Sequence, residues 1–109
     1  MVDTLIWRPV ALVSDISADT HTLRVTHNNE AVCLYDLDGA VRATQDQCPH
    51  GNASLADGWV EDGTVECPLH QGVFDIVSGK PRCPPVTTDL RCYDVQVADG
   101  TIYLRVETS

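Results

Sequence analysis

The sequence predicts an all-β protein, and three observations support this. Short stretches of alternating apolar and polar residues recur along the chain, separated by turn-forming pairs such as Asp38-Gly39 and Asp99-Gly100. Nowhere do apolar residues keep the 3.6-residue spacing of an amphipathic helix over roughly eleven positions. The chain has 109 residues, the length of a single domain. We therefore expect about nine or ten short antiparallel strands in a sandwich or barrel-like stack.

The first strand is expected over residues 6–13, where Pro9 lacks a backbone N–H and so indicates an edge position or a bulge. The polar segment 14–20 is a turn. The run His27-Asn28-Asn29 and the pair Asp38-Gly39 predict tight hairpins. These turns separate three further expected strands, at residues 21–26, 31–36 and 41–45.

The second part of the chain continues the pattern. A strand at 59–60, a turn at 61–63 and a strand at 64–66 predict a short hairpin. Another strand is expected at 73–76, followed by a turn at 78–81. The C-terminal hairpin pairs residues 91–98 with residues 101–106 around Asp99-Gly100.

The composition is acidic. Sixteen Asp and Glu stand against seven Lys and Arg, the formal net charge is −9, and Lys80 is the single lysine. Binding to nucleic acid or to an anionic membrane needs clustered basic residues, so both are disfavoured. An acidic surface suits docking to a basic face of a partner, or it serves solubility alone.

The sequence favours a cytoplasmic location. No segment approaches the roughly 18 apolar residues of a transmembrane helix. Residues 1–8 lack the basic region and apolar run of a secretion signal. The five cysteines are an odd number, which agrees with a reducing compartment.

Two half-sites with metal-ligand spacing dominate the middle of the chain. They are Cys48-x-His50 and Cys67-x-x-His70, separated by sixteen residues. Each offers one thiolate and one imidazole, so together they supply a complete set of four ligands. Two centres use two Cys and two His: tetrahedral zinc, and a [2Fe-2S] cluster with two His on one iron. Zinc fingers usually pair like with like, whereas here each half-site is mixed, which favours the cluster.

With the following Gly-Val-Phe-Asp, the two half-sites resemble the signature of Rieske [2Fe-2S] proteins. The chain length, the acidic balance and the Gly-Lys-Pro-x-x-Pro-Pro run are similar to those of the small ferredoxins of bacterial ring-hydroxylating oxygenases. The resemblance implies that Cys48 and Cys67 bind the inner iron, and that His50 and His70 bind the outer iron near the surface. It also implies a single Rieske domain over residues 1–109.

Within that domain, the resemblance implies a small cluster-binding subdomain at about residues 45–85 on a β base formed by residues 1–44 and 86–109. The Pro81, Pro84 and Pro85 loop would shield the cluster from water. Phe74 is expected in the core, and Trp59 is either structural or a docking contact.

The chain is expected to carry electrons and not to act as an enzyme. Without His50 and His70, only His21 and His27 remain for a second iron site, and there is no Gly-x-Gly-x-x-Gly for a dinucleotide. The resemblance implies a flavoprotein reductase and a terminal oxygenase as partners. We expect a monomer that docks through the tip around His50 and His70, with acidic residues nearby, such as Asp46, Asp57 and Glu61.

Two alternatives stay open. Small Rieske subunits also accompany assimilatory nitrite reductases, and a zinc-stabilised interaction module would have no redox role. Outside the motif, Cys33 and Cys92 are expected as small core residues, and Cys83 lies near the site without a ligand role. His21 and His27 are expected to be solvated.

The reduction potential is expected at the low end of the Rieske range, at about −150 mV. High-potential relatives carry a disulfide where this chain has Ala53 and Leu69, and a tyrosine where Phe74 is the nearest match. Fewer hydroxyl donors toward the sulfurs stabilise the reduced cluster less.

Overall fold

The computed structural model describes residues 6–49, 51–69, 72–82 and 88–106. Within these ranges the chain forms ten strands, all paired antiparallel, and two short 3-10 helices, which confirms the all-β prediction. The strands are β1 (Trp7–Leu12), β2 (Thr22–His27), β3 (Glu30–Leu37), β4 (Ala40–Gln45), β5 (Trp59–Glu61), β6 (Thr64–Glu66), β7 (Val73–Asp75), β8 (Cys92–Tyr93), β9 (Val95–Ala98) and β10 (Thr101–Arg105). The 3-10 helices are η1 (Val13–Asp15) and η2 (Leu55–Asp57). No helix in the part described is long enough to cross a membrane.

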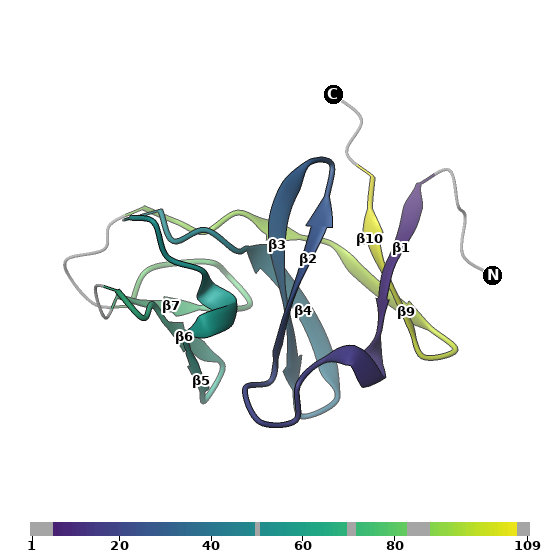
Figure 1. Cartoon of the computed structure of the whole chain (residues 1–109), viewed down its shortest axis with the longest axis horizontal. Coiled ribbons are helices and arrows are strands. Elements are labelled where there is room, and N and C mark those ends of the chain that lie inside the picture. Colours follow the sequence, from purple (N-terminus) through teal and green to yellow (C-terminus); the bar gives the residue numbers. More distant parts are fainter. Residues whose placement is uncertain (1–5, 50, 70–71, 83–87, 107–109) are drawn as a thin grey trace.

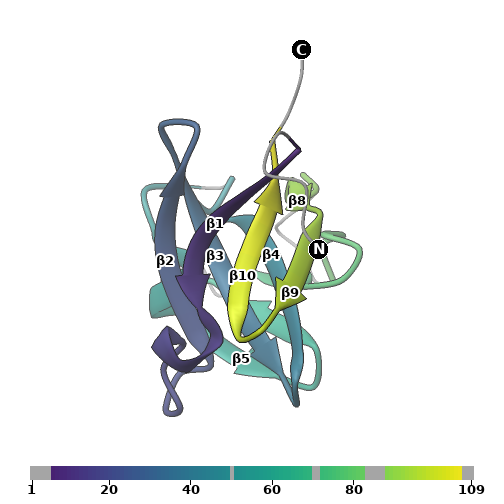
Figure 2. The same ribbon diagram turned by 90° about the vertical axis from the view of Figure 1, so that its right-hand side faces the viewer.

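The strands form three sheets in the described residues, with the orders β1-β10-β9, β2-β3-β4-β8 and β5-β6-β7. Figure 1 shows them in a row, with β5-β6-β7 at one end, β1, β9 and β10 at the other, and β2, β3 and β4 between. Figure 2, turned by a quarter, shows β1, β10 and β9 in front of β2, β3 and β4. The middle sheet therefore supports the sheets on both sides.

Strand β3 is buried on both faces because it lies between two cores. Val32 and Leu34 face the core that contains Ile102, on the side of the β1-β10-β9 sheet. Cys33 and Tyr35, the alternate residues, belong to the other core, on the side of the β5-β6-β7 sheet. All four side chains of this run are fully buried. One strand thus connects the base of the molecule to the small sheet.

The predicted hairpin turns are present. In each, two consecutive residues have positive φ, the backbone of type I′ turns that Asn, Asp and Gly adopt at least cost. The pairs and their φ angles are Asn28 (52°) and Asn29 (63°), Asp38 (54°) and Gly39 (95°), Asp62 (51°) and Gly63 (76°), and Asp99 (51°) and Gly100 (78°). The register of β1 against β10 shifts between Pro9 and Ala11, which confirms the predicted irregularity at the proline.

Three expectations were wrong. The single strand expected at 91–98 is two strands, because β8 pairs with β4 and β9 pairs with β10, so the chain changes sheet at Asp94. Cys92 is exposed and not a core residue. His27 is buried, with only 2% of its surface exposed, because its ring packs edge-on against Tyr93 at 5.9 Å between centroids. His21 is exposed, as expected.

Candidate functional site

The first ligand loop leaves β4 and closes on itself as a small hairpin. The Leu55 N–H donates to the Asp46 carbonyl (2.7 Å), and the Cys48 N–H donates to the Ala53 carbonyl (2.9 Å). At the tip, the Gly51 N–H donates to the Cys48 carbonyl (3.2 Å). The Cys48 side chain faces inward, and the residue is 1% exposed. The loop therefore directs its thiol toward the interior.

The second ligand loop joins β6 to β7. Glu66 pairs with Val73 at the end of this hairpin, and the Cys67 N–H donates to the Gly72 carbonyl (2.7 Å). Cys67 is fully buried, whereas Leu69, two residues further, is 55% exposed. The loop thus has an inner side that carries a thiol and an outer side that carries an apolar residue.

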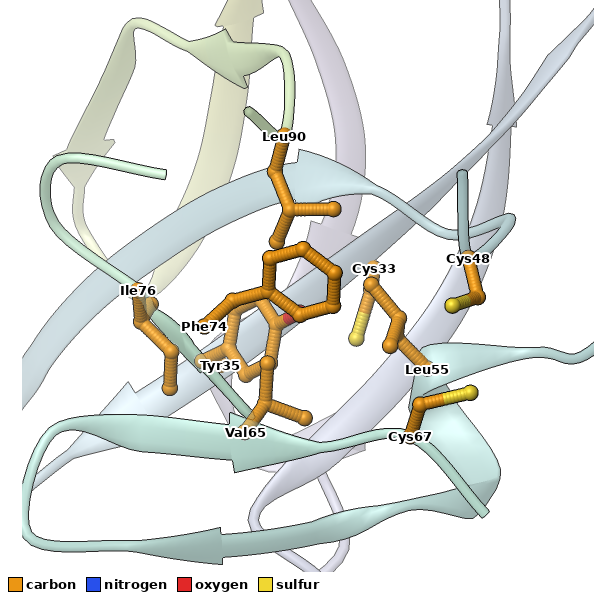
Figure 3. Close-up of a cluster of buried hydrophobic side chains, with 9 residues drawn as sticks. All are labelled: Cys33, Tyr35, Cys48, Leu55, Val65, Cys67, Phe74, Ile76 and Leu90. Atoms are coloured by element: carbon orange, nitrogen blue, oxygen red, sulfur yellow. The ribbon is translucent and has the colours of Figure 1, made fainter. Parts of the chain in front are cut away.

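The two thiols belong to one hydrophobic core, although eighteen residues lie between Cys48 and Cys67 in the sequence. Figure 3 shows their sulfur atoms pointing into the space between the two loops, with Leu55 and Phe74 in the same cluster. Phe74 is fully buried, which confirms that it is a core residue. The other two predicted ligands, His50 and His70, lie outside the described residues.

The chemistry of this pair fits a metal centre. Two thiolates in one apolar core are costly unless a cation neutralises them. Thiolates are also the ligands that zinc and iron–sulfur clusters use. The structure thus brings Cys48 and Cys67 together, each on its own hairpin loop, at one end of the molecule. The ligand set with His50 and His70 stays a prediction.

A third thiol, that of Cys33, lies in the same core on β3. Burial raises the pKa of Cys33 from 9.0 to about 12. A thiol with so high a pKa stays protonated at neutral pH. Its burial confirms that Cys33 is a core residue, whereas Cys83 lies outside the described residues.

The tyrosine in this core is also engaged elsewhere. The Tyr35 hydroxyl pairs with Thr44 Oγ1 at 2.8 Å, and burial raises the pKa of Tyr35 well above its usual value. The Thr44 hydroxyl in turn donates to the Gln45 carbonyl (2.9 Å). The Tyr35 hydroxyl is therefore directed toward β4.

Part of the proline loop can be located. Pro81 forms an isolated bridge with Phe74, and the Arg82 N–H donates to the Val73 carbonyl (2.7 Å). The loop therefore starts beside β7, next to the second ligand loop. Pro84 and Pro85, expected to shield the site, lie outside the described residues.

The expectation that Asp46 lies on the docking surface was wrong. Asp46 is only 3% exposed, because its carboxylate accepts hydrogen bonds from the Ser54 hydroxyl (2.9 Å) and the Ala56 N–H (3.0 Å). Asp57 and Glu61 are exposed, as expected. Sequence reasoning missed the structural role of Asp46, and the one available signal was its position two residues before Cys48.

Trp59 lies at the ligand-loop end of β5. It pairs with Glu66, the residue before Cys67, and 59% of its surface is exposed. A tryptophan that supported the core would be buried, so the structure favours the docking interpretation of this residue.

Comparison with known proteins identifies this arrangement. The profile of the family described as the Rieske [2Fe-2S] domain matches residues 6–94. The anthranilate 1,2-dioxygenase ferredoxin subunit of Burkholderia cepacia is 37% identical over 100 residues, which cover 92% of this chain and 92% of that protein. The Sphingomonas yanoikuyae B1 ferredoxin structure superposes with a TM-score of 0.84 at 31% identity, covering 91% of this chain and 97% of that chain.

Two further structures bear on partners. One, a complex of reduced oxygenase and oxidized ferredoxin in carbazole 1,9a-dioxygenase, matches with a TM-score of 0.84 at 32% identity over 95% of this chain and 96% of that chain. The other, a putative small subunit of a nitrite reductase, matches with a TM-score of 0.80 at 25% identity over 90% of this chain and 96% of that chain.

Proposed function

Because the chain belongs to the Rieske [2Fe-2S] domain family, we propose that it is a one-electron carrier whose cluster is held by Cys48, His50, Cys67 and His70. The observation that carries this proposal is the pair of buried thiols, which two separate hairpin loops bring into one core. Each loop also carries a histidine shortly after its cysteine, two residues after Cys48 and three residues after Cys67, and these would supply the remaining two ligands. When bound, such a cluster exchanges one electron between its diferric and mixed-valent states.

The chain's own residues determine how the electron enters and leaves. Cys48 and Cys67 hold the buried side of the site, and Leu55 and Phe74 exclude water from it. Leu69, the residue before His70 in the sequence, is exposed, so the second ligand loop offers an apolar contact to an approaching partner. An electron would pass at this tip, where the distance to a docked partner is shortest.

The names of the relatives, ferredoxin components of dioxygenase systems, support a proposal for the partners. We infer that the chain accepts electrons from an NAD(P)H-dependent flavoprotein reductase and passes them to a terminal ring-hydroxylating oxygenase. It performs no substrate chemistry of its own. It acts as a monomer in the cytoplasm, where NAD(P)H is produced.

The docking surface comprises the tip of the ligand loops and the neighbouring end of the small sheet. Leu69 and Trp59 provide exposed apolar area there, 55% and 59% exposed. Asp57 and Glu61 flank Trp59 in sequence and are also exposed. An apolar centre with an acidic rim suits transient docking to a basic face of a redox partner.

The first test is anaerobic purification, followed by iron and sulfide analysis, visible absorption and EPR before and after dithionite. A coloured protein with two irons per chain and a reduced-state EPR signal typical of nitrogen ligation is expected. Replacing His70 with Cys is expected to change that signal. A colourless protein with one zinc per chain would refute the electron-carrier proposal.

Reconstitution with partner proteins then tests the proposed route of the electrons. With a flavoprotein reductase and a ring-hydroxylating oxygenase from one of the named dioxygenase systems, the holoprotein is expected to support NAD(P)H-dependent hydroxylation. Omitting the holoprotein should reduce the rate at least about tenfold, since each electron must pass through the carrier.

A second candidate function has one observation in its favour, the likeness to the putative nitrite reductase small subunit. In that case the chain would bind tightly to a large reductase subunit. Affinity purification from the native cell distinguishes the two, because stable recovery of a large sirohaem-containing subunit would favour the second function.

A further inference from the structure

Asp46 lies at the start of the first ligand loop and forms hydrogen bonds with the residues at its other end. Its side chain accepts two hydrogen bonds, from the Ser54 hydroxyl (2.9 Å) and from the Ala56 N–H (3.0 Å). Its carbonyl accepts the Leu55 N–H at 2.7 Å. One residue therefore holds three consecutive positions on the far side of the loop that carries Cys48.

The same residue connects this loop to the middle sheet. The Asp46 N–H donates to the Ala31 carbonyl on β3 (3.0 Å), and Arg24 on β2 places Nη1 3.9 Å from Asp46 Oδ2. The Thr22 hydroxyl on β2 donates to the Ala56 carbonyl at 2.8 Å. The loop is thus attached to β2 and β3 through Asp46 and through Ala56, its hydrogen-bond partner.

Burial reduces the solvent screening of the Asp46 carboxylate, so its charge acts more strongly on neighbouring buried groups. Asp46 is 3% exposed, whereas the Arg24 side chain is 61% exposed. Solvent therefore screens the ion pair between Arg24 and Asp46, but it screens the field of the Asp46 carboxylate inside the protein much less. Cys48 is two residues away along the chain and is also buried. The negative charge therefore lies buried at the base of the loop that carries the first half-site.

We propose that Asp46 is a positioning residue of the cluster site with two effects. It fixes the first ligand loop in its binding conformation, and its carboxylate lowers the reduction potential. Reduction adds an electron to the site, and a nearby buried negative charge makes that addition less favourable. This inference rests on the proposed [2Fe-2S] cluster and adds a determinant of its potential that is not a ligand.

Two substitutions separate the effects, with the holoprotein as the sample. In Asp46→Asn the amide oxygen still accepts hydrogen bonds while the charge is lost. The midpoint potential, measured by EPR-monitored redox titration, is expected to rise. The one-electron equilibrium should shift roughly three- to tenfold toward the reduced state. In Asp46→Ala the acceptor is lost as well, so a chelator should remove iron from the folded protein several-fold faster than from Asp46→Asn.

Two control variants complete the design. Asp57→Asn removes an exposed carboxylate of η2, close to Ala56, and is expected to shift the equilibrium less than about twofold because water screens it. Arg24→Gln removes the partial neutralisation of Asp46 and is expected to move the potential in the negative direction. This variant keeps the charge effect testable even when Asp46→Asn does not fold.

A potential of Asp46→Asn equal to that of Asp57→Asn would overturn the charge effect. Equal iron-loss rates for Asp46→Asn, Asp46→Ala and the wild type would overturn the positioning effect. A wild-type protein without a [2Fe-2S] signal would refute the proposed function instead, and the two failures are therefore distinguishable.

Discussion

At the residue scale, three thiols in one core differ in their chemistry because of where their loops place them. Cys48 and Cys67 stand on opposing hairpin loops and face a common space (Figure 3). Cys33 stands on a sheet strand, surrounded by apolar side chains and close to the Tyr35 ring. The same residue type is consequently a ligand candidate in the loops and an inert core residue in the strand.

The buried Cys33 and Tyr35 predict a loss of stability at alkaline pH. The folded-state pKa of Cys33 is about 12, raised from 9.0, and that of Tyr35 is also raised, so the unfolded chain releases these protons first. Their contribution is fully present below about pH 9 and is lost as pH rises toward 12. The urea concentration at the unfolding midpoint of the holoprotein should therefore decrease as the pH is raised from 8 to 10.

In Cys33→Ala that fall is expected to be smaller, at a cost of about 1 kcal/mol in stability at pH 8. Its EPR signal should equal that of the wild type, since Cys33 is not among the proposed ligands. An unchanged pH dependence would show that other groups cause the alkaline loss.

The potential is a second prediction at this scale. Leu69 and Ala53 stand where high-potential relatives are expected to carry a disulfide, and buried Phe74 offers no hydroxyl. Tyr35 is directed to Thr44 instead. A midpoint of about −150 mV is expected by redox titration. A value well above zero would contradict this hydrogen-bond argument.

At the element scale, tight turns set the position of the small sheet. Gly79 ends the turn after β7, at φ 76°, and its carbonyl accepts the Leu90 N–H at 2.7 Å. This contact joins the small sheet to the segment that enters β8. A Cβ at Gly79 would collide with the Leu90 carbonyl oxygen and lie 2.9 Å from Cys92 Sγ.

Gly79→Ala and Gly100→Ala form a matched pair. Both glycines have positive φ (76° and 78°), but a Cβ at Gly100 would meet no atom within 4 Å. Gly100→Ala is therefore expected to cost about 1 kcal/mol of unfolding free energy. Gly79→Ala should cost at least about 2 kcal/mol, because backbone must also move. Equal costs in urea unfolding would show that the turn can shift freely.

At the scale of the whole molecule, the fold separates the electron-transfer end from its support. The ligand loops and the small sheet occupy one end, and the β1-β10-β9 sheet occupies the other (Figure 1). The chain as a whole carries a formal net charge of −9. Only the acidic residues near the ligand loops, such as Asp57 and Glu61, are expected to act in docking.

Charge reversal tests this division. Asp57→Lys combined with Glu61→Lys is expected to lower the rate of electron transfer to the oxygenase several-fold at low ionic strength and to weaken its salt dependence. Stopped-flow measurement over a salt series checks this. The control Asp94→Lys lies in the base, where the Asp94 carboxylate forms an exposed ion pair with Arg105 at 3.6 Å. An equal effect per reversed charge in the control would indicate net charge rather than a docking surface.

Much of this protein was predictable because the deciding interactions are local. The Asn28-Asn29 turn depends on backbone angles that these residues tolerate, and the irregularity at Pro9 depends on its missing N–H. The alternation of Val32 and Leu34 with Cys33 and Tyr35 is legible in the sequence as well. So is the Cys and His spacing, since metal ligation requires particular side chains on short loops.

Tertiary structure decided the burial of particular residues and the pairing of strands, because both depend on which segments pack together. His27 is buried because Tyr93, far along the chain, packs against it, and Asp46 is buried because its own loop folds back over it. The strand expected at 91–98 divides because its two halves find different partners, β4 and β10. Periodicity describes which side of a strand is apolar. It does not say which neighbour covers that side, and burial, sheet order and the surroundings of the two thiols all follow from the neighbour.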